Sequence, residues 1–183
     1  MKNGKLNLLY ILYIMFLYSC STPKFYSEIN QMQNDIKNET EKNTDSAISV
    51  KIKSNDVNRL VFKRLEKELV YTNHIIYFNI PSSSIMDEKY WFVVYDVDNQ
   101  KYYELESSDN NKKRIQLLNS SDTLINSYYR FIFNSYLDDK CEMLKQKGNT
   151  SKSGVSTYEA IYEVNLKSKV NRSCYFRNFL YLE

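Results

Sequence analysis

Hydrophobic residues recur at helical spacing between residues 57 and 69. They are Val57, Leu60, Val61, Leu65 and Leu69. This spacing places the five side chains on one face of a helix, and Asn55 or Asp56 can accept hydrogen bonds from the free amides at its start. We therefore predict a helix whose apolar face packs on a core.

Strand patterns surround this helix. Residues 90–97 are hydrophobic at both odd and even positions, which predicts a central strand covered on both faces. Residues 101–106 alternate, and Asp98-Asn99 predicts a hairpin turn between the two strands. Further strands are predicted over residues 48–52, 71–81, 158–166 and 173–182, with Glu159 and Glu163 on a wet face, and residues 115–118 fit a short strand or a turn.

A second helix is predicted from Ser120, Ser121 or Asp122 to about Lys147. Its apolar stripe consists of Leu124, Tyr128, Phe131, Ile132, Tyr136 and Leu144. An aromatic stripe at this spacing is typical of a core-facing helix, so we interpret it as packing and not as a ligand cage.

The order of these elements predicts an α+β fold. We expect two layers, with an antiparallel or mixed sheet and two helices packed on one face. The globular domain is predicted to cover residues 48–183.

The first 20 residues have the layout of an export signal. Lys2 and Lys5 precede a largely apolar stretch over residues 6–18, which ends in Ser19-Cys20 and then becomes polar. A membrane-spanning helix needs about 20 apolar residues, so this stretch is too short for a comfortable span.

Leu17-Tyr18-Ser19-Cys20 resembles the bacterial lipobox, in which a Leu stands three residues before an invariant Cys and a small residue precedes that Cys. The resemblance covers the first 20 residues only. It implies that residues 1–19 are a lipoprotein signal peptide, that cleavage falls before Cys20, and that Cys20 carries a diacylglyceryl group and an acylated amino terminus. Two or more acyl chains give lasting anchorage, because each buried CH₂ contributes about 0.8 kcal/mol.

The resemblance to the lipobox also implies a location in the cell. Ser21 stands where Asp would retain a Gram-negative lipoprotein in the inner membrane, so the expected location is the outer membrane of the cell envelope. An ordinary cleaved signal peptide and an N-terminal anchor helix with an incidental cysteine are the alternatives.

Residues 20–47 are predicted to be the lipidated cysteine and a flexible tether. The segment is rich in Asn, Glu, Lys, Thr and Ser, and such a composition buries little apolar surface. Ile29, Met32 and Ile36 suggest a transient helical turn within it.

Charge argues against a nucleic-acid partner. The chain of 183 residues has a formal charge of +3, and removal of residues 1–19 takes away two lysines and leaves +1. Nucleic-acid binding needs a concentrated basic face. The one basic run, at residues 112–114, follows Asp109-Asn110-Asn111, and this sequence is typical of a solvated turn.

Two cysteines remain beside Cys20. Cys141 and Cys174 are 33 residues apart and would fold outside the cytosol, where disulfides persist. A disulfide and two buried thiols are both compatible with the sequence.

Catalytic patterns are missing from the sequence. His74 is the single histidine and lies in an apolar strand, which is typical of a structural histidine and excludes paired-histidine metal sites. Asp96 and Asp98 have the first spacing of a calcium loop but fit the hairpin better, and no pair of carboxylates has a defined separation for glycoside hydrolysis. We expect no enzyme activity, no cofactor and no metal.

The sequence therefore predicts a small non-enzymatic lipoprotein, held in the membrane by lipid on Cys20, whose head binds another envelope protein. One alternative is an immunity-type lipoprotein that blocks an incoming toxin. Another is a ligand-binding or glycan-binding lipoprotein whose site is lined by the aromatic residues Trp91, Tyr95, Tyr102 and Tyr103.

Overall fold

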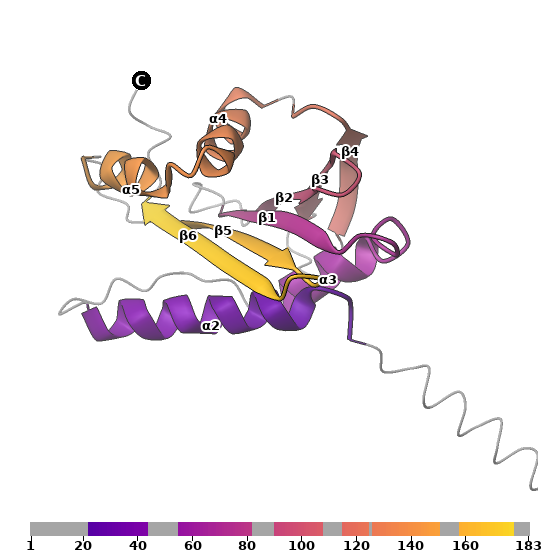
Figure 1. Cartoon of the computed structure of the whole chain (residues 1–183), viewed down its shortest axis with the longest axis horizontal. Coiled ribbons are helices and arrows are strands. Elements are labelled where there is room, and N and C mark those ends of the chain that lie inside the picture. The colour runs from indigo at the N-terminus through magenta and orange to yellow at the C-terminus, as the bar shows by residue number, and fades with distance from the viewer. Residues whose placement is uncertain are drawn as a thin grey trace, which may run out of the picture.

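The computed structural model describes residues 22–43, 55–81, 90–107, 115–124, 126–150 and 158–177. Within these ranges six strands form one sheet in the order β4-β3-β2-β1-β5-β6, and every neighbouring pair is antiparallel (Figure 1). The strands are β1 His74–Pro81, β2 Tyr90–Asp96, β3 Lys101–Ser107, β4 Ile115–Ser121, β5 Tyr158–Asn165 and β6 Val170–Arg177.

Helices cover both faces of this sheet (Figure 1). On one face, α2 (Tyr26–Asn43) and α3 (Asn55–Arg64) share a core with Ile75 and Tyr77 of β1. On the other face, α4 (Ser127–Leu137) and α5 (Cys141–Thr150) share a core with Ile76 and Phe78. The sheet is therefore the middle layer of three.

The predicted α+β class with an antiparallel sheet is confirmed, but the layering differs from the predicted arrangement of two helices on one face. The helix that begins at Asn55 and the helix that begins at Ser127 lie on opposite faces. The physical reason lies in β1 and β2, whose consecutive residues 75–78 and 92–94 are all buried. Strands that are apolar on both sides need a cover on both sides.

The flexible tether predicted over residues 20–47 is wrong for the segment that forms α2. Phe25, Ile29, Met32 and Ile36 are all buried in the core. Ile29, Met32 and Ile36 have the three- and four-residue spacing of one helix face, and Phe25 lies just before the helix begins. The folded body thus begins well before residue 48.

A buried polar chain fixes α2 and α3 on β1. The Tyr77 hydroxyl donates to Asn58 Oδ1 at 2.7 Å, and Asn58 Nδ2 donates to Gln33 Oε1 at 2.6 Å. All three residues are at most 1% exposed. Burial raises the pKa of Tyr77 well above its ordinary value, followed by the effect of the neighbouring Tyr162, so its hydroxyl remains a donor at neutral pH.

The long helix predicted from about residue 120 to Lys147 is divided. Ser120 and Ser121 belong to β4, and α4 starts only after Asn126, whose side chain accepts from the amides of Tyr128 and Tyr129. The chain then leaves the helix at residues 138–140, where Asp139 has a φ of 59°. A short polar cap and a left-handed residue explain the two boundaries.

Other boundaries shift by a few residues. Residues 115–118 are part of a strand, and the last strand starts at Val170 and not at Ser173 after a turn over residues 166–169. The predicted strand over residues 48–52 and the chain end after residue 177 lie outside the described residues. None of the helices in the described ranges has the length and apolar character that a bilayer crossing requires.

Cys141 and Cys174 form a disulfide, with their Cα atoms 5.9 Å apart. The bond joins the start of α5 to β6. Further along the same helix, a Cβ on Gly148 would lie 2.5 Å from the carbonyl oxygen of Arg177, so glycine allows α5 to approach the strand closely. Together these features hold α5 against the edge of the sheet.

We expect removal of this disulfide by Cys141→Ala with Cys174→Ala to lower the free energy of unfolding by about 3 to 4 kcal/mol, because the bond closes a long loop in the unfolded chain. Urea unfolding of the oxidised protein and of the double variant measures the difference. Chemical reduction of the unsubstituted protein should produce the same loss. A difference below about 1 kcal/mol would show that the bond does not form or does not constrain the unfolded chain.

Candidate functional site

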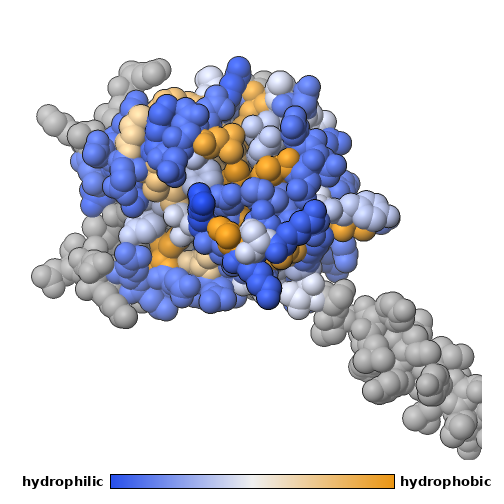
Figure 2. Space-filling view, viewed as in Figure 1, coloured by the Kyte–Doolittle hydropathy of each residue, from blue (hydrophilic) through white to orange (hydrophobic). Residues whose placement is uncertain are grey.

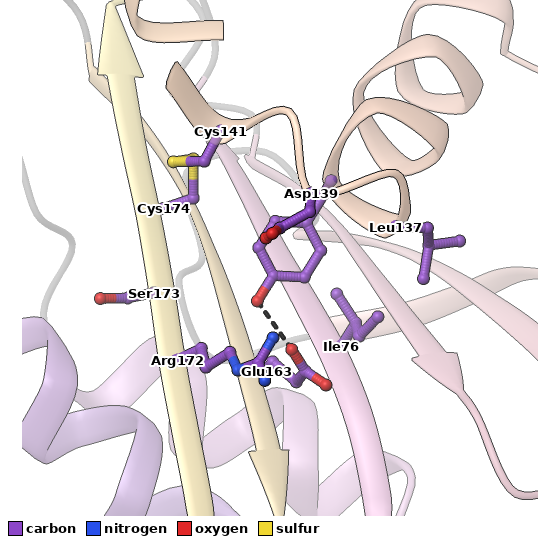
Figure 3. Close-up of a pocket in the computed structure, with 9 residues that line it drawn as sticks. Ile76, Leu137, Asp139, Cys141, Glu163, Arg172, Ser173 and Cys174 are labelled. Atoms are coloured by element: carbon purple, nitrogen blue, oxygen red, sulfur yellow. Dashed lines mark hydrogen bonds between the residues drawn. A yellow bond between two sulfur atoms is a disulfide. The ribbon is translucent and has the colours of Figure 1, made fainter. Parts of the chain in front are cut away.

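The described residues form a cavity of about 380 Å³ on the α4–α5 side of the sheet (Figure 3). Its walls come from the end of α4, the start of α5 and strands β1, β5 and β6. The lining residues are Ile76, Tyr136, Leu137, Asp139, Cys141, Glu163, Arg172, Ser173 and Cys174. This volume lies within the range of about 300 to 1,000 Å³ that is usual for small-molecule sites.

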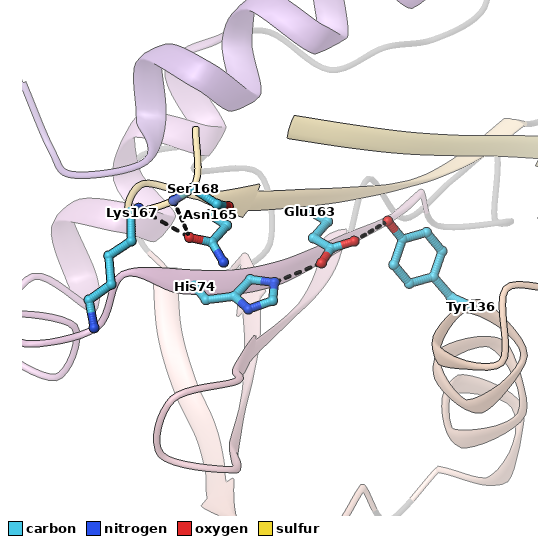
Figure 4. Close-up of polar contacts among 6 residues, drawn as sticks. All are labelled: His74, Tyr136, Glu163, Asn165, Lys167 and Ser168. Carbon is cyan, nitrogen blue, oxygen red and sulfur yellow. Dashed lines mark hydrogen bonds and ion pairs between the residues drawn. The ribbon is translucent and has the colours of Figure 1, made fainter. Parts of the chain in front are cut away.

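The carboxylate of Glu163 is the centre of the polar part of the site. The Tyr136 hydroxyl donates to Glu163 Oε2 at 2.9 Å, and His74 Nε2 lies 2.7 Å from Glu163 Oε1 (Figure 4). The sheet register explains the second contact, because Glu163 of β5 pairs with Ile76 of β1, two residues after His74. The predicted structural role of His74 agrees with this bond.

Opposite charges meet in the cavity. Arg172 pairs with Glu163 in the register of β5 and β6, and its side chain extends toward Glu163 (Figure 3). Asp139 contributes a second carboxylate from the bend after α4. Burial, followed by the Glu163 carboxylate, raises the pKa of Tyr136, so the phenol stays protonated and can donate at neutral pH.

A second tyrosine–glutamate bond joins α4 to β5. The Tyr128 hydroxyl donates to Glu159 Oε2 at 2.9 Å. The tyrosines 128 and 136 are eight residues apart on a helix, about 12 Å, and the glutamates 159 and 163 are four residues apart on a strand, about 13 Å. Equal spacing lets both bonds form at once and fixes the register of the helix on the strand.

Glu159 and Glu163 were both predicted to lie on a wet strand face, and the structure corrects this. Glu159 is fully buried and Glu163 is partly buried. Burial raises the pKa of the Glu159 carboxyl to about 8, despite the hydrogen bond from Tyr128, which acts in the opposite direction. One sequence signal could have identified these two glutamates as partners of a helix. The distance between two tyrosines at helical spacing matches the distance between two glutamates at strand spacing.

The predicted aromatic site is not assembled. Tyr95 and Tyr102 stack with their ring centroids 4.3 Å apart on the face that α4 covers. Tyr103 is buried on the opposite face, and Trp91 is partly exposed at the far end of β2. The four side chains therefore do not line one pocket.

Several side chains around the cavity already have partners or point elsewhere. Its two cysteines are joined to each other, and the Ser173 side chain points away from the cavity (Figure 3). His74 is hydrogen-bonded to Glu163. Across the described ranges, no group of three His, Cys, Asp or Glu side chains is placed to hold a metal ion.

The predicted lipid attachment residue, Cys20, lies outside the described residues, which begin at Thr22. Comparisons of the chain with protein-family models, with curated proteins and with solved structures find no match.

Proposed function

We propose that this chain is a lipoprotein, anchored through Cys20 in the outer membrane of a Gram-negative envelope, with a non-enzymatic head that binds another envelope protein. The observation that carries the proposal is the disulfide between Cys141 and Cys174. Disulfides persist in oxidising compartments outside the cytosol. The bond therefore supports folding outside the cytosol, which the export signal at residues 1–20 also implies, from a distant part of the chain.

The surface of the head supports a binding role at the sheet edge. Figure 2 shows a mainly hydrophilic face on which hydrophobic residues are scattered and not gathered into one large patch. Strand β4 is the outer strand on one side, with a register shift opposite Glu104 and Leu105. Leu118, which lies at this irregularity, is 51% exposed. A strand edge with an exposed apolar side chain offers both backbone and side-chain contacts to a partner.

Lipidation is tested on the protein produced in Gram-negative bacterial cells. Trypsin should release the peptide from Cys20 to Lys24, and its mass should show a diacylglyceryl group and an acylated amino terminus. The matched control, Cys20→Ser, should retain residues 1–19. A free thiol at position 20 in the unsubstituted protein would contradict the proposal, as would an uncut leader.

The partner class is tested by cross-linking the lipidated protein in intact envelopes. One reproducible protein partner, lost in a Leu118→Glu variant and kept in a Ser120→Glu variant on the same strand, would support binding at the β4 edge. A toxin encoded beside the gene and neutralised by the protein would favour the immunity alternative.

A second candidate function is binding of a small polar ligand in the cavity around Glu163. The observation in its favour is the convergence of Arg172, Asp139, Glu163 and the Tyr136 hydroxyl on one cavity. Such a mixture of charges suits a ligand that carries both an amino group and a carboxylate. Free amino acids and short peptides should raise the melting temperature of the protein in a thermal-shift assay but should not raise that of its Arg172→Gln variant. The Lys167→Gln variant, on the distant β5–β6 turn, should respond as the unsubstituted protein does.

A further inference from the structure

One end of the fold is built from three short segments that hydrogen bonds hold together. Residues 70–73 lie between the turn over residues 97–100 and the turn over residues 166–169. The amide of Asn73 donates to Asp98 Oδ2 at 2.7 Å, and the carbonyl of Asn73 accepts from the amide of Leu166 at 2.8 Å. We call these three segments, with Lys24, the β1-start end.

The N-terminal part of the described chain is fastened to this end. Lys24 Nζ donates to the carbonyl oxygen of Val70 at 3.2 Å and to that of Thr72. The next residue, Phe25, is buried although its φ is 70°, a conformation that a phenylalanine adopts only where its surroundings hold it. Pro23 is also buried, and its carbonyl accepts from the amide of Tyr26 at 3.2 Å. The path of the chain into α2 is therefore fixed from Pro23 onward, and Figure 1 shows this start of the chain beside α3 and the β5–β6 turn.

The β1-start end exposes the side chains of Val70 and Tyr71, in the segment whose backbone carbonyls accept from Lys24. Tyr71 is 89% exposed and Val70 is 52% exposed. Packing within the head explains neither exposure, because both side chains point outward from a loop whose backbone is pinned. Tyrosine is enriched at membrane–water interfaces, where its ring meets the acyl boundary and its hydroxyl meets water.

Positive charge surrounds these side chains. Lys24, Lys167 and Lys169 are exposed at this end. The acids at this end are Asp98, which is exposed and accepts from the Asn73 amide, and Asp96, which lies at the foot of the 97–100 turn and is buried against Thr72. Three exposed lysines therefore face one exposed carboxylate, and this positive excess favours phosphate-bearing headgroups.

The length of chain before the fold places this end near the lipid. Cys20 and Thr22 are two residues apart, which spans at most about 7 Å. The headgroup layer on one side of a bilayer is about 5 to 8 Å thick. A cysteine whose thioether lies at the acyl boundary therefore holds Pro23 and Lys24 at the headgroup surface, with no room for a free tether.

We infer that the β1-start end is the membrane-facing surface of the head, and that Tyr71 and Val70 enter the lipid interface while the three lysines contact headgroup phosphates. This inference rests on the proposed lipidation of Cys20. The sheet then stands with the opposite end, which carries Trp91, away from the membrane.

Tryptophan fluorescence tests the orientation, because Trp91 is the only tryptophan of the chain. The full chain, processed and lipidated in cells, is placed in phospholipid vesicles with brominated acyl chains, which quench tryptophan on contact. Tyr71→Trp in a Trp91→Phe background should show a blue-shifted emission and about twofold or greater quenching, since interfacial side chains reach the headgroup–acyl boundary. The unsubstituted protein is the matched control, and its Trp91 should be almost unaffected.

The possible quenching results separate the membrane-facing assignment from the proposed lipidation. Quenching of Tyr71→Trp without quenching of Trp91 supports the inference, and it should weaken when Lys167 and Lys169 are both replaced by Glu. A lipidated Cys20 with no quenching of Tyr71→Trp would overturn the membrane-facing assignment and leave the proposed function standing. Equal quenching at both ends would overturn the orientation, and an unmodified Cys20 in the mass spectrum would overturn both proposals.

Discussion

Ile29→Asp should lower the free energy of unfolding by about 5 kcal/mol or more, enough to unfold a domain of ordinary stability. Ile29 is fully buried in the core that α2 and α3 share with the sheet. The substitution removes a large apolar side chain, at a cost of about 2 to 5 kcal/mol, and also places an unpaired carboxylate among apolar groups. Circular dichroism during urea unfolding measures the loss.

Gln31→Asp is the matched control for this change. Gln31 is exposed on the same helix, so the same new carboxylate meets water there and should change stability by no more than about 0.5 kcal/mol. Equal, small effects of the two substitutions would mean that residues 26–43 do not pack on the sheet and behave as a tether after all.

Glu159→Gln should remove a pH dependence that the buried carboxyl imposes. In the unfolded chain this group loses its proton near pH 4.5, whereas burial in the folded protein raises its pKa to about 8. Between these values the folded state binds more protons than the unfolded state, so stability falls as the pH rises from about 4.5 to about 8 and then levels off. The full shift corresponds to about 4 to 5 kcal/mol.

The variant keeps an oxygen that can accept from the Tyr128 hydroxyl but carries no charge at any pH. Unfolding free energies measured from about pH 5 to about pH 9 should therefore diverge, with Glu159→Gln the more stable protein at the alkaline end. Glu39→Gln, the same substitution at an exposed site on α2, should follow the unsubstituted protein. Parallel curves for Glu159→Gln and the unsubstituted protein would show that the carboxyl is not buried.

Local patterns in the sequence predicted most strands correctly, because the apolar positions of a strand depend on which of its faces are covered. Continuous apolar runs predict β1 and β2, and alternation predicts β3 and β5. The α2 helix was missed because its buried apolar residues Ile29, Met32 and Ile36 are embedded in a polar composition, although their spacing of three and four residues is helical. In such a helix the amino-acid composition reflects mainly the exposed residues, whereas the spacing of the few apolar residues identifies the buried face.

The site could be predicted only in part. Tyr102 and Tyr103 are neighbours in a strand, and neighbours in a strand face opposite sides, so the sequence alone could have excluded a single aromatic site. The cavity around Glu163 could not be predicted, because it depends on which helix crosses β5. The bond of Tyr136 to Glu163 exists only after α4 has crossed the sheet.

The packing of α2 has a consequence for the order in which the molecule is assembled. The first helix of the described chain rests on β5 and β6, its last two strands. The packing of α2 on the sheet cannot form until residues 158–177 have been synthesised and paired, and contacts this distant in sequence form slowly. Under the proposed export, a chain that crosses the membrane from its amino terminus can complete the packing of α2 on the sheet only after residues 158–177 have crossed.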